Sequence, residues 1–327
     1  MKILVAIYSD VRSWCIPDAN VASLRARFPE HSFVRADSDE QTRASIPDAD
    51  VAFSSRIEPH HLAAASRLRW VHSPAAGVGS MLFPAMVASP VVMTNSRGIS
   101  AVPIAEHVVS VTLALFRDLR LAWRRQSEHE WAQDEFNAGR SVRTLSGSRA
   151  LVVGLGAIGS ETARLLAAFG AEVTGIRRRV DLPPPSGVRT VHPPAALTEA
   201  LAASDLVVIA APNTPETRHL MGAEELARMK QDSVLVNVSR GSLVDERALI
   251  DALDRGPLGG AALDVFEREP LPPESRLWSH PRVLVTPHVS GFQRHYWRDA
   301  TALFADNLRR FTGGEPLRNV VDKQAGY

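Results

Sequence analysis

A glycine-rich turn in the middle of the chain constrains the fold more than any other feature of the sequence. An apolar run at residues 150–153 leads into Gly154-Leu-Gly156-Ala-Ile-Gly159, and an amphipathic segment follows as far as Phe169. This order predicts a strand, a tight turn and a helix. The first glycine permits the turn, the second lets the backbone approach a pyrophosphate, and the third allows helix and strand to pack closely. Because a helix N-terminus offers N–H groups to phosphates, the turn predicts a dinucleotide site.

Three consecutive arginines stand where such a site normally has an acid. A second apolar run at residues 171–176 is followed by Arg177, Arg178 and Arg179. An acidic side chain there would bind a ribose 2′-hydroxyl and repel a 2′-phosphate, whereas arginine pairs with phosphate. We therefore expect NADP(H) to be the preferred cofactor, with NAD(H) also possible. We expect Arg177 and Arg178 to hold the 2′-phosphate.

Length, charge and cysteine content restrict the class of protein. A chain of 327 residues favours two domains, and a net charge of +1 gives no reason to expect nucleic acid or a membrane surface as a partner. The single cysteine, Cys15, excludes an intrachain disulfide framework and CxxC metal sites, and we expect no metal. The apolar stretches at residues 3–8 and 104–116 are too short for a signal or membrane-spanning segment, so we expect a cytoplasmic protein.

Short β-branched runs alternate with segments of helical period along the chain, which predicts an α/β fold with parallel sheets. Because the glycine motif normally opens a dinucleotide domain, its mid-chain position indicates two Rossmann-like domains with an active-site cleft between them. We expect a discontinuous substrate domain at residues 1–97 and 290–327, and a dinucleotide-binding domain at 98–289. A long helix at about 102–127 would lead into the second domain, and a helix at 296–311 would return to the first.

Polar residues at the ends of apolar runs form the candidate catalytic group. Arg240, Glu269 and His288 each follow a separate run, and Asp264 ends one of them. Since ligands bind outside the carboxyl ends of parallel strands, we expect these side chains at one rim. Reduction of a 2-oxo acid needs a proton for the carbonyl oxygen, which His288 can supply, and a cation for the carboxylate, which Arg240 can supply. Glu269 would orient the His288 ring and stabilise its imidazolium form.

Each of these residues also has a structural interpretation. A histidine after a strand is more often structural, Arg240 could lie on the surface, and Glu269 could cap a turn. Asp264 could contact the cofactor ribose or serve the fold. The group is nevertheless far more specific than its members. His107, on a buried-looking helix, is expected to form a core pair with Glu106.

Several motifs together resemble the D-isomer-specific 2-hydroxyacid dehydrogenase family, in the order in which the family has them. The resemblance covers nearly the whole chain and is highly specific. The motifs are Gly154-Leu-Gly-Ala-Ile-Gly159, Val238-Ser-Arg-Gly-Ser-Leu-Val-Asp245, Gly260-Ala-Ala-Leu-Asp-Val-Phe-Glu-Arg-Glu-Pro270, Thr286-Pro-His-Val-Ser-Gly291, Ile104-Ala-Glu-His107 and Ala76-Gly-Val78.

The resemblance implies catalysis by Arg240, Glu269 and His288. It also implies that Arg240 and His288 bind the substrate together with the backbone N–H groups of Ala76 and Gly77. The cofactor contacts that we expect on these grounds are Gly154, Gly156, Ala157, Ile158, Gly159, Arg177, Arg178, Pro212, Thr217, Val238, Asp264 and Gly291.

The family organisation further implies a homodimer formed largely through the coenzyme domains. The segment at residues 126–131 resembles the family's dimerisation arm, and Trp131 would extend toward the site of the partner subunit. The chain departs from the common pattern at residues 96–103, which leaves the contacts near the nicotinamide open. It departs again at Arg177, which resembles the NADP(H)-preferring glyoxylate/hydroxypyruvate reductase branch.

The function that we expect is NADP(H)-dependent reduction of a small 2-oxo acid, such as glyoxylate or hydroxypyruvate, to the D-2-hydroxy acid. One alternative is a dinucleotide-responsive, corepressor-like binding protein. Another is a dehydrogenase of the same family with a different hydride donor, such as phosphite. Formate is disfavoured as the donor because Glu269 stands where the formate enzymes have glutamine.

Overall fold

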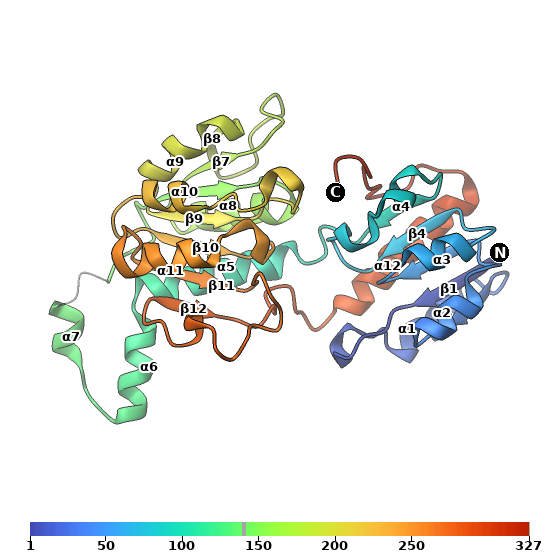
Figure 1. Ribbon diagram of the computed structural model, residues 1–327, viewed down its shortest axis with the longest axis horizontal. Coiled ribbons are helices and arrows are strands. Elements are labelled where there is room, and N and C mark those ends of the chain that lie inside the picture. Colours follow the sequence, from blue (N-terminus) through green and yellow to red (C-terminus); the bar gives the residue numbers. More distant parts are fainter. Residues whose placement is uncertain (139–141, 327) are drawn as a thin grey trace. The chain divides into compact units, whose positions relative to one another are not determined.

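The chain folds into two compact units, each built around one parallel sheet. The computed structural model describes residues 1–138 and 142–326. The first unit comprises Met1–Ile99 and Gln293–Tyr327, and the second comprises Ser100–Phe292. Helices flank the sheet in each unit (Figure 1). The prediction of two α/β domains with parallel sheets is confirmed.

The sheet of the first unit has five strands in the order β2-β1-β3-β4-β5. All neighbouring strands are parallel. The strands are β1 (Lys2–Ala6), β2 (Ser32–Arg35), β3 (Val51–Ser54), β4 (Trp70–Ser73) and β5 (Val92–Asn95). The helices are α1 (Asp18–Arg27), α2 (Asp39–Ser45), α3 (Pro59–Ala64), α4 (Pro84–Ala88) and α12 (Tyr296–Gly313), with 3-10 turns at Arg12–Trp14 and Gly79–Met81.

Both faces of this sheet are covered, which explains why its strands read as continuous apolar runs. Successive side chains of a strand point to opposite faces. Leu4 of β1 therefore packs in the layer that holds α2, α3 and α4, whereas Ile3 packs with α1 and α12. Phe304 of α12 is fully buried in the second layer, so the C-terminal helix completes the core of the unit formed by the N-terminal residues.

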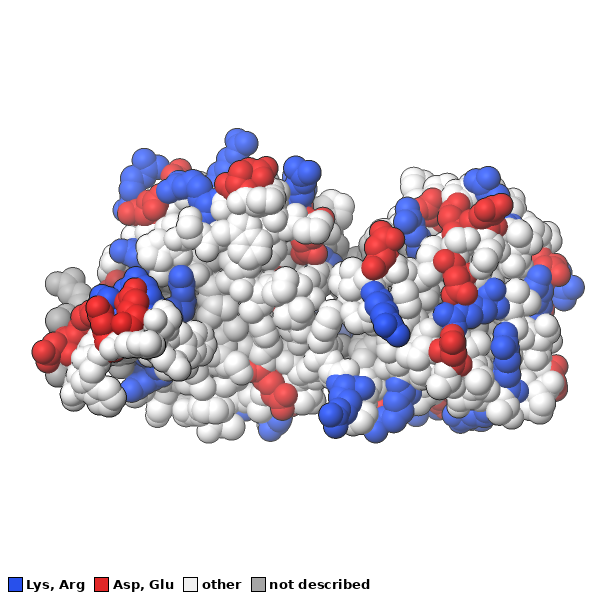
Figure 2. Space-filling view, turned by 90° about the horizontal axis from the view of Figure 1, so that it is seen from below, with Lys and Arg blue, Asp and Glu red and all other residues white. Residues whose placement is uncertain are grey.

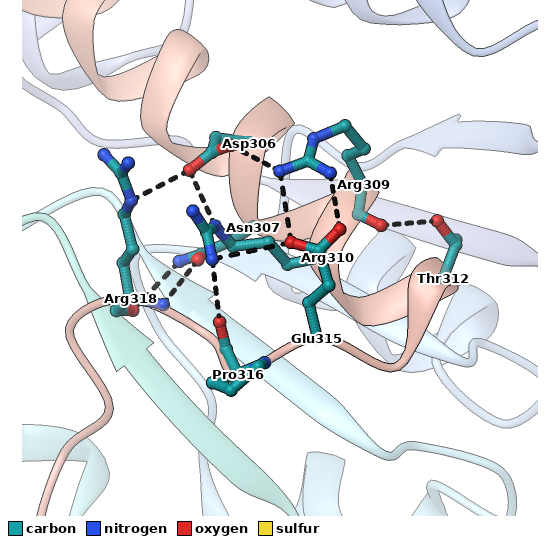
Figure 3. Close-up of polar contacts among 8 residues, drawn as sticks. All are labelled: Asp306, Asn307, Arg309, Arg310, Thr312, Glu315, Pro316 and Arg318. Carbon is teal, nitrogen blue, oxygen red and sulfur yellow. Dashed lines mark hydrogen bonds and ion pairs between the residues drawn. The ribbon is translucent and has the colours of Figure 1, made fainter.

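A polar network closes the C-terminal end of α12 (Figure 3). Asp306 pairs with Arg310 and Arg318 at 3.0 and 3.1 Å. The fully buried amide of Asn307 donates to the carbonyl of Arg318 and accepts from its N–H, at 3.0 and 2.8 Å. These bonds hold the segment after the helix against its last turns.

The sheet of the second unit has seven parallel strands in the order β12-β11-β10-β9-β6-β7-β8. The strands are β6 (Arg149–Val153), β7 (Glu172–Ile176), β8 (Val188–His192), β9 (Leu206–Ile209), β10 (Val234–Asn237), β11 (Gly260–Leu263) and β12 (Val283–Val285). The α-helices are α5 (Ala101–Phe116), α6 (Leu119–Glu128), α7 (Gln133–Ala138), α8 (Ala157–Ala168), α9 (Leu197–Ala203), α10 (Ala223–Arg228) and α11 (Glu246–Arg255). Short 3-10 turns lie at Pro194–Ala196, Pro215–Thr217, Gly241–Leu243 and Arg276–Trp278.

The seven-stranded sheet separates two apolar layers. Leu151 of β6 packs in the layer formed with α9, α10 and α11, and its neighbour Val152 packs in the layer formed with α5 and α8. This two-sided burial fixes the register of β6, which ends at the glycine turn.

The single helix predicted at about 102–127 is wrong, because the chain breaks it into α5 and α6. Asp118 has a φ of 48°, in the left-handed region that ends a helix. α5 is buried along much of its length, whereas α6 has no buried residue. Figure 1 shows α6 and α7 standing out from the rest of the second unit. The break therefore separates a core helix from an exposed arm.

Charged side chains of both signs are intermixed on the face shown in Figure 2. This distribution accords with the net charge of +1. Among the described residues, no helix is both long enough and apolar enough to cross a membrane.

Candidate active site

The glycine turn lies between β6 and α8, as its sequence predicts. Gly154 has a φ of 96°, and a Cβ there would come within 2.6 Å of the Ala211 backbone. A Cβ on Gly159 would lie 1.9 Å from the carbonyl oxygen of Gly154. These two glycines are thus required by the fold itself, one for the turn and one for the contact between helix and strand.

Gly156 differs from its two neighbours in the motif. It caps α8, and a Cβ on it would meet no atom of the chain within 4 Å. Packing within the protein therefore does not require glycine at this position. A glycine at this position instead fits a phosphate group that approaches the backbone at the helix N-terminus. Ala157 and Ile158 begin the first turn there.

The arginines predicted to bind the 2′-phosphate follow β7. Arg177 donates from Nη2 to the carbonyls of Leu182 and Pro183, and its buried Nε has no hydrogen-bond partner. Arg178 is exposed, and its charge lowers the pKa of Glu216 as a secondary effect after hydrogen bonds from Thr214 and from the backbone. The Nε–H group of Arg177, which has no acceptor in the described chain, is suited to bind the phosphate of a ligand at the end of β7.

Pro212 and Thr217 lie together after β9. The Thr217 hydroxyl donates to the Pro212 carbonyl at 2.7 Å, which holds the turn at Pro215–Thr217 against the strand end. Val238, which directly follows β10, donates from its N–H to Ile209 at 3.3 Å. Gly291 accepts from the Ser100 hydroxyl at 3.3 Å. The predicted cofactor residues of this unit thus follow neighbouring strands of one parallel sheet, apart from Gly291 farther along the chain.

His288 and Glu269 form a direct pair. Nδ1 of His288 lies 2.7 Å from Oε2 of Glu269, and the other carboxylate oxygen accepts the Phe266 N–H at 3.0 Å. Burial raises the pKa of Glu269, but these hydrogen bonds and the positive charges of His288 and Arg240 outweigh it, so the net shift is downward. An ionised Glu269 can only accept in this pair, so Nδ1 of His288 donates to it.

Arg240 lies on the loop that follows β10. Its Nη1 donates to the Ser239 carbonyl at 2.6 Å, and the Asn237 amide donates to the Arg240 carbonyl at 2.9 Å. Burial lowers the pKa of Arg240 and the charge of Glu269 raises it, with a net downward shift. A guanidinium stays protonated at neutral pH, so Arg240 contributes a positive charge beside the Glu269 carboxylate.

Gly241 makes this arrangement possible, although it is not among the residues predicted from the sequence. A Cβ on Gly241 would lie 1.8 Å from the carbonyl carbon of Phe266 and 2.2 Å from the Glu267 nitrogen. Only glycine allows the Arg240 loop to lie this close to the loop that leads to Glu269. The signal in the sequence is a glycine directly after a candidate substrate-binding arginine.

Asp264 holds the backbone around His288. It is buried, and one carboxylate oxygen accepts the Thr286 hydroxyl at 2.6 Å and the Val289 N–H at 2.9 Å, while the other accepts the Ser290 N–H at 3.0 Å. His288 has a φ of 53°, which is unusual for a residue with a side chain. Three hydrogen bonds to one carboxylate therefore stabilise a strained conformation at the histidine.

The predicted pairing of His107 with Glu106 is wrong. Nε2 of His107 lies 3.3 Å from the Thr286 hydroxyl, which itself donates to Asp264. Adjacent residues of a helix do not face each other, so Glu106 is not the natural partner. His107 instead joins the hydrogen bonds of Thr286 and Asp264 behind the His288 loop, and Thr286 lies far from it in the sequence.

The predicted carboxylate-binding residues lie in the first unit, after β4. Ala76 and Gly77 are exposed, and the Ala76 carbonyl accepts from the Asn95 amide at 2.7 Å. The hydroxyl of Tyr296 donates to the Pro74 carbonyl at the start of the same loop. These bonds fix the backbone at the carboxyl ends of β4 and β5. Trp131, predicted to extend from the arm, is 93% exposed.

Among the residues that the structure describes, one group of side chains has the composition of a metal site, namely Asp39, His60 and His61 in the first unit. Its geometry favours contacts within the chain, because burial lowers the pKa of His61 and so favours its neutral ring. The Glu58 N–H donates to Nδ1 of the fully buried His61 at 3.2 Å, which leaves the hydrogen of a neutral ring on Nε2. Nε2 lies 3.1 Å from the Asp39 carboxylate. His61 is thus a buried residue near the start of α3.

The second unit thus combines a glycine turn of the dinucleotide-binding type with the His288–Glu269 pair and the guanidinium of Arg240. The sequence model described as "D-isomer specific 2-hydroxyacid dehydrogenase, NAD binding domain" matches residues 109–290. This range covers more than half of the chain and includes the glycine turn and the Arg240, Glu269 and His288 group. The chain belongs to the D-isomer specific 2-hydroxyacid dehydrogenase family. The predicted family and the predicted dinucleotide cofactor are confirmed.

Curated and solved relatives share this family. Glyoxylate/hydroxypyruvate reductase A of Klebsiella pneumoniae (strain 342) is 36% identical over 229 residues, which are 68% of this chain and 68% of that protein. The NADPH- and MES-bound D-isomer specific 2-hydroxyacid dehydrogenase of Xanthobacter autotrophicus Py2 is 33% identical over 100% of this chain and 99% of that chain, with a TM-score of 0.84. The NADPH-dependent glyoxylate/hydroxypyruvate reductase of Sinorhizobium meliloti, bound to NADP and sulfate, is 30% identical with the same coverage and TM-score.

The chain also matches several D-3-phosphoglycerate dehydrogenases and spans about half of their length. The enzyme of Methanocaldococcus jannaschii is 29% identical over 86% of this chain and 53% of that protein. The relatives therefore share the family but differ in the substrates that their names give.

Proposed function

We propose that this protein reduces a small 2-oxo acid of the glyoxylate or hydroxypyruvate type to the D-2-hydroxy acid, with NADP(H) as cofactor. The observation that carries the proposal is the 2.7 Å bond between His288 and Glu269, at the rim that also carries the charge of Arg240. An acid held by a carboxylate and placed beside a cation matches the needs of a 2-oxo acid.

Each side chain has a distinct function in the proposed reaction. The bound cofactor supplies a hydride to the carbonyl carbon. His288 gives a proton to the carbonyl oxygen, so that C=O becomes CH–OH and the ring is left neutral. Glu269 stabilises the ring before this transfer. Arg240 binds the substrate carboxylate and polarises the carbonyl, and the N–H groups of Ala76 and Gly77 bind the same carboxylate.

The preference for NADP(H) rests on the end of β7. The residues directly after that strand are three arginines and not an acid, and the buried Nε of Arg177 lacks a partner within the described chain. The relatives bound to NADPH and to NADP support this preference.

We further propose that the protein is a homodimer that associates through the arm. α6 has no buried residue, and Trp123 and Trp131 are 56% and 93% exposed. Large apolar side chains grouped on a projecting segment are typical of an interaction surface. Sedimentation analysis should show a dimer for the native protein and a shift toward monomer for Trp123→Glu.

A kinetic matrix tests the proposed function. NADPH and NADH are each measured with glyoxylate, hydroxypyruvate, pyruvate and bulkier 2-oxo acids, and the oxidised cofactors are measured with D-3-phosphoglycerate and with phosphite. We expect turnover of the small 2-oxo acids with NADPH, and its loss in His288→Ala. Protein that oxidises NADPH with none of these acids would refute the reductase. Turnover with D-3-phosphoglycerate or phosphite alone would refute the substrate class, and binding of NADPH without any turnover would favour a binding protein.

A further inference from the structure

A buried histidine in the first unit has no part in the proposed chemistry. His72 lies on β4 and is fully buried, with its ring 5.4 to 6.0 Å from the rings of Phe53, Trp70 and Phe304. Polar groups in such surroundings need hydrogen-bond partners. His72 has one on each ring nitrogen, and both partners lie on or just after the neighbouring strand β5.

The first partner is the hydroxyl of Thr94. The indole N–H of Trp70, which can only donate, lies 2.8 Å from the Thr94 oxygen, and Nδ1 of His72 lies 2.6 Å from the same atom. The Thr94 oxygen accepts from the indole, and its own hydrogen needs an acceptor. In the described part of the chain, Nδ1 of His72 is that acceptor, so Nδ1 carries no hydrogen.

The second partner is the hydroxyl of Ser96, at 3.3 Å from Nε2 of His72. The same hydroxyl lies 3.0 Å from the carbonyl of Ser73, which can only accept. Because Ser96 uses its one hydrogen on this carbonyl, it must accept from His72. Nε2 therefore carries the hydrogen, in agreement with the assignment of Nδ1. Burial acts in the same direction, since it lowers the pKa of His72 to about 3 and keeps the ring neutral.

These hydrogen bonds form a chain, called the relay below, in which every donor points the same way. The relay ends at the start of the 74–77 loop. It runs from the Trp70 indole through Thr94, His72 and Ser96 to the Ser73 carbonyl. Neighbouring bonds continue it into the loop, since the Ala75 N–H donates to the Ser73 hydroxyl at 3.1 Å and the Ser96 N–H donates to the Ala75 carbonyl at 3.2 Å. The last links of the relay thus act on Ser73 and Ala75, which lead to Ala76 and Gly77.

We propose that His72 is a positioning residue, which as a neutral link between Thr94 and Ser96 fixes the N–H groups of Ala76 and Gly77 for the substrate carboxylate. The use of those N–H groups for substrate binding rests on the proposed function. The hydrogen bonds of the relay do not depend on it. A carboxylate is bound in the ground state and the transition state alike, so a loosened loop weakens substrate binding more than it slows the chemical step.

Three substitutions along the relay test this role. His72→Phe keeps an aromatic ring and removes both hydrogen bonds, Ser96→Ala cuts the last link with little change in volume, and His72→Gln can still accept from Thr94 and donate to Ser96. We expect His72→Phe and Ser96→Ala to raise the KM for the 2-oxo acid about tenfold or more, with kcat changed by less than about threefold and the KM for NADPH unchanged. His72→Gln should restore a KM near that of the native protein.

Hydrogen exchange supplies a readout that does not depend on turnover. The amides of residues 75–77 should exchange faster in His72→Phe and Ser96→Ala than in the native protein and in His72→Gln. Ser54→Ala is the matched control, because it removes another buried hydroxyl of the same sheet, bonded to the carbonyls of Ala6 and Arg56. It should leave both readouts unchanged.

The outcomes separate the two proposals. Unchanged KM and unchanged exchange in His72→Phe and Ser96→Ala would overturn the positioning role, as would a His72→Gln variant that behaves like His72→Phe. Should the native protein reduce no 2-oxo acid, the proposed function fails, and the exchange rates of residues 75–77 alone decide whether His72 orders the loop.

Discussion

Nδ1 of His288 lies 2.7 Å from Oε2 of Glu269, although 19 residues separate the two in the sequence. The bond exists because the two residues follow adjacent parallel strands, β11 and β12, whose carboxyl ends meet at one edge of the sheet. In the proposed reaction, Nε2 of His288 is the nitrogen that gives up a proton, because Nδ1 is bonded to Glu269. The relation of these two side chains therefore supports the proposed roles of His288 as the acid and of Glu269 as the group that stabilises it.

Replacing Glu269 by glutamine should slow reduction without weakening substrate binding. Glutamine keeps a hydrogen-bond acceptor for the His288 ring but removes the negative charge that stabilises its protonated form. We expect kcat to fall about 10²- to 10³-fold, within the range for a general acid, and KM to stay within about threefold. Steady-state kinetics with NADPH and glyoxylate measure both values.

Glu267→Gln is the control for this change. Glu267 lies on the same loop, and its carboxylate lies 3.1 Å from Nε2 of His219. We expect its kcat within about twofold of the native value. Equal losses in the two variants would mean that the charge of the loop, and not the pair with His288, affects the rate.

The glycine turn allows binding to be separated from folding. A Cβ on Gly156 meets no atom of the chain, so Gly156→Ala should leave the free energy of unfolding within about 0.5 kcal/mol of the native value and should weaken NADPH binding at least tenfold. Gly159→Ala should instead destabilise the fold by about 1–3 kcal/mol or more, because its Cβ would lie 1.9 Å from a backbone oxygen. Urea unfolding and fluorescence titration with NADPH measure the two effects.

Gly79→Ala serves as the control, since it too has open space around its Cβ but lies in the other unit. It should change neither quantity. A Gly156→Ala protein that binds NADPH like the native one would show that the pyrophosphate does not approach this residue.

The three arginines after β7 provide a test of cofactor choice. Arg177→Ala and Arg178→Ala should each raise the KM for NADPH about 10- to 100-fold, the effect of losing one or two hydrogen bonds to a charged group, with little change for NADH. Arg179→Ala is the matched control, because it removes the same charge one residue farther along an exposed segment. A native protein that uses NADH better than NADPH would contradict the assignment while leaving the hydride chemistry intact.

Much of the fold and of the acid–base group follows from sequence because the relevant signals are local. A glycine after a strand, or a polar residue where an apolar run ends, can be read without knowing which strands are neighbours. Since parallel strands share one edge for their carboxyl ends, Arg240, Glu269 and His288 could be grouped before their contacts were known.

Features that depend on distant partners could not be predicted in this way. The partner of His107 is Thr286, which is 179 residues away, and the nearby Glu106 suggested the wrong pair. His72 lies in an apolar strand, and the sequence of that strand does not indicate that Thr94 and Ser96 form hydrogen bonds with both ring nitrogens. The end of α5 likewise depends on the left-handed conformation of Asp118, which a helical pattern of apolar residues conceals.

The neutral state of buried His72 predicts a specific loss of stability in acid. Burial lowers its pKa from 6.5 to about 3 in the folded chain, whereas the unfolded chain takes up a proton near pH 6.5. Between these values the unfolded state binds more protons, so the free energy of unfolding falls as the pH falls, by up to about 1.4 kcal/mol per pH unit from this residue. From pH 6.5 to pH 4.5 the native protein should lose about 2 kcal/mol more than His72→Gln, measured by urea unfolding at each pH.

His295→Gln, which replaces an exposed histidine of the same unit, should keep the native pH dependence. Parallel stability profiles for His72→Gln and the native protein would show that the His72 ring accepts a proton without unfolding of the chain. They would contradict the neutral state of His72 in the relay.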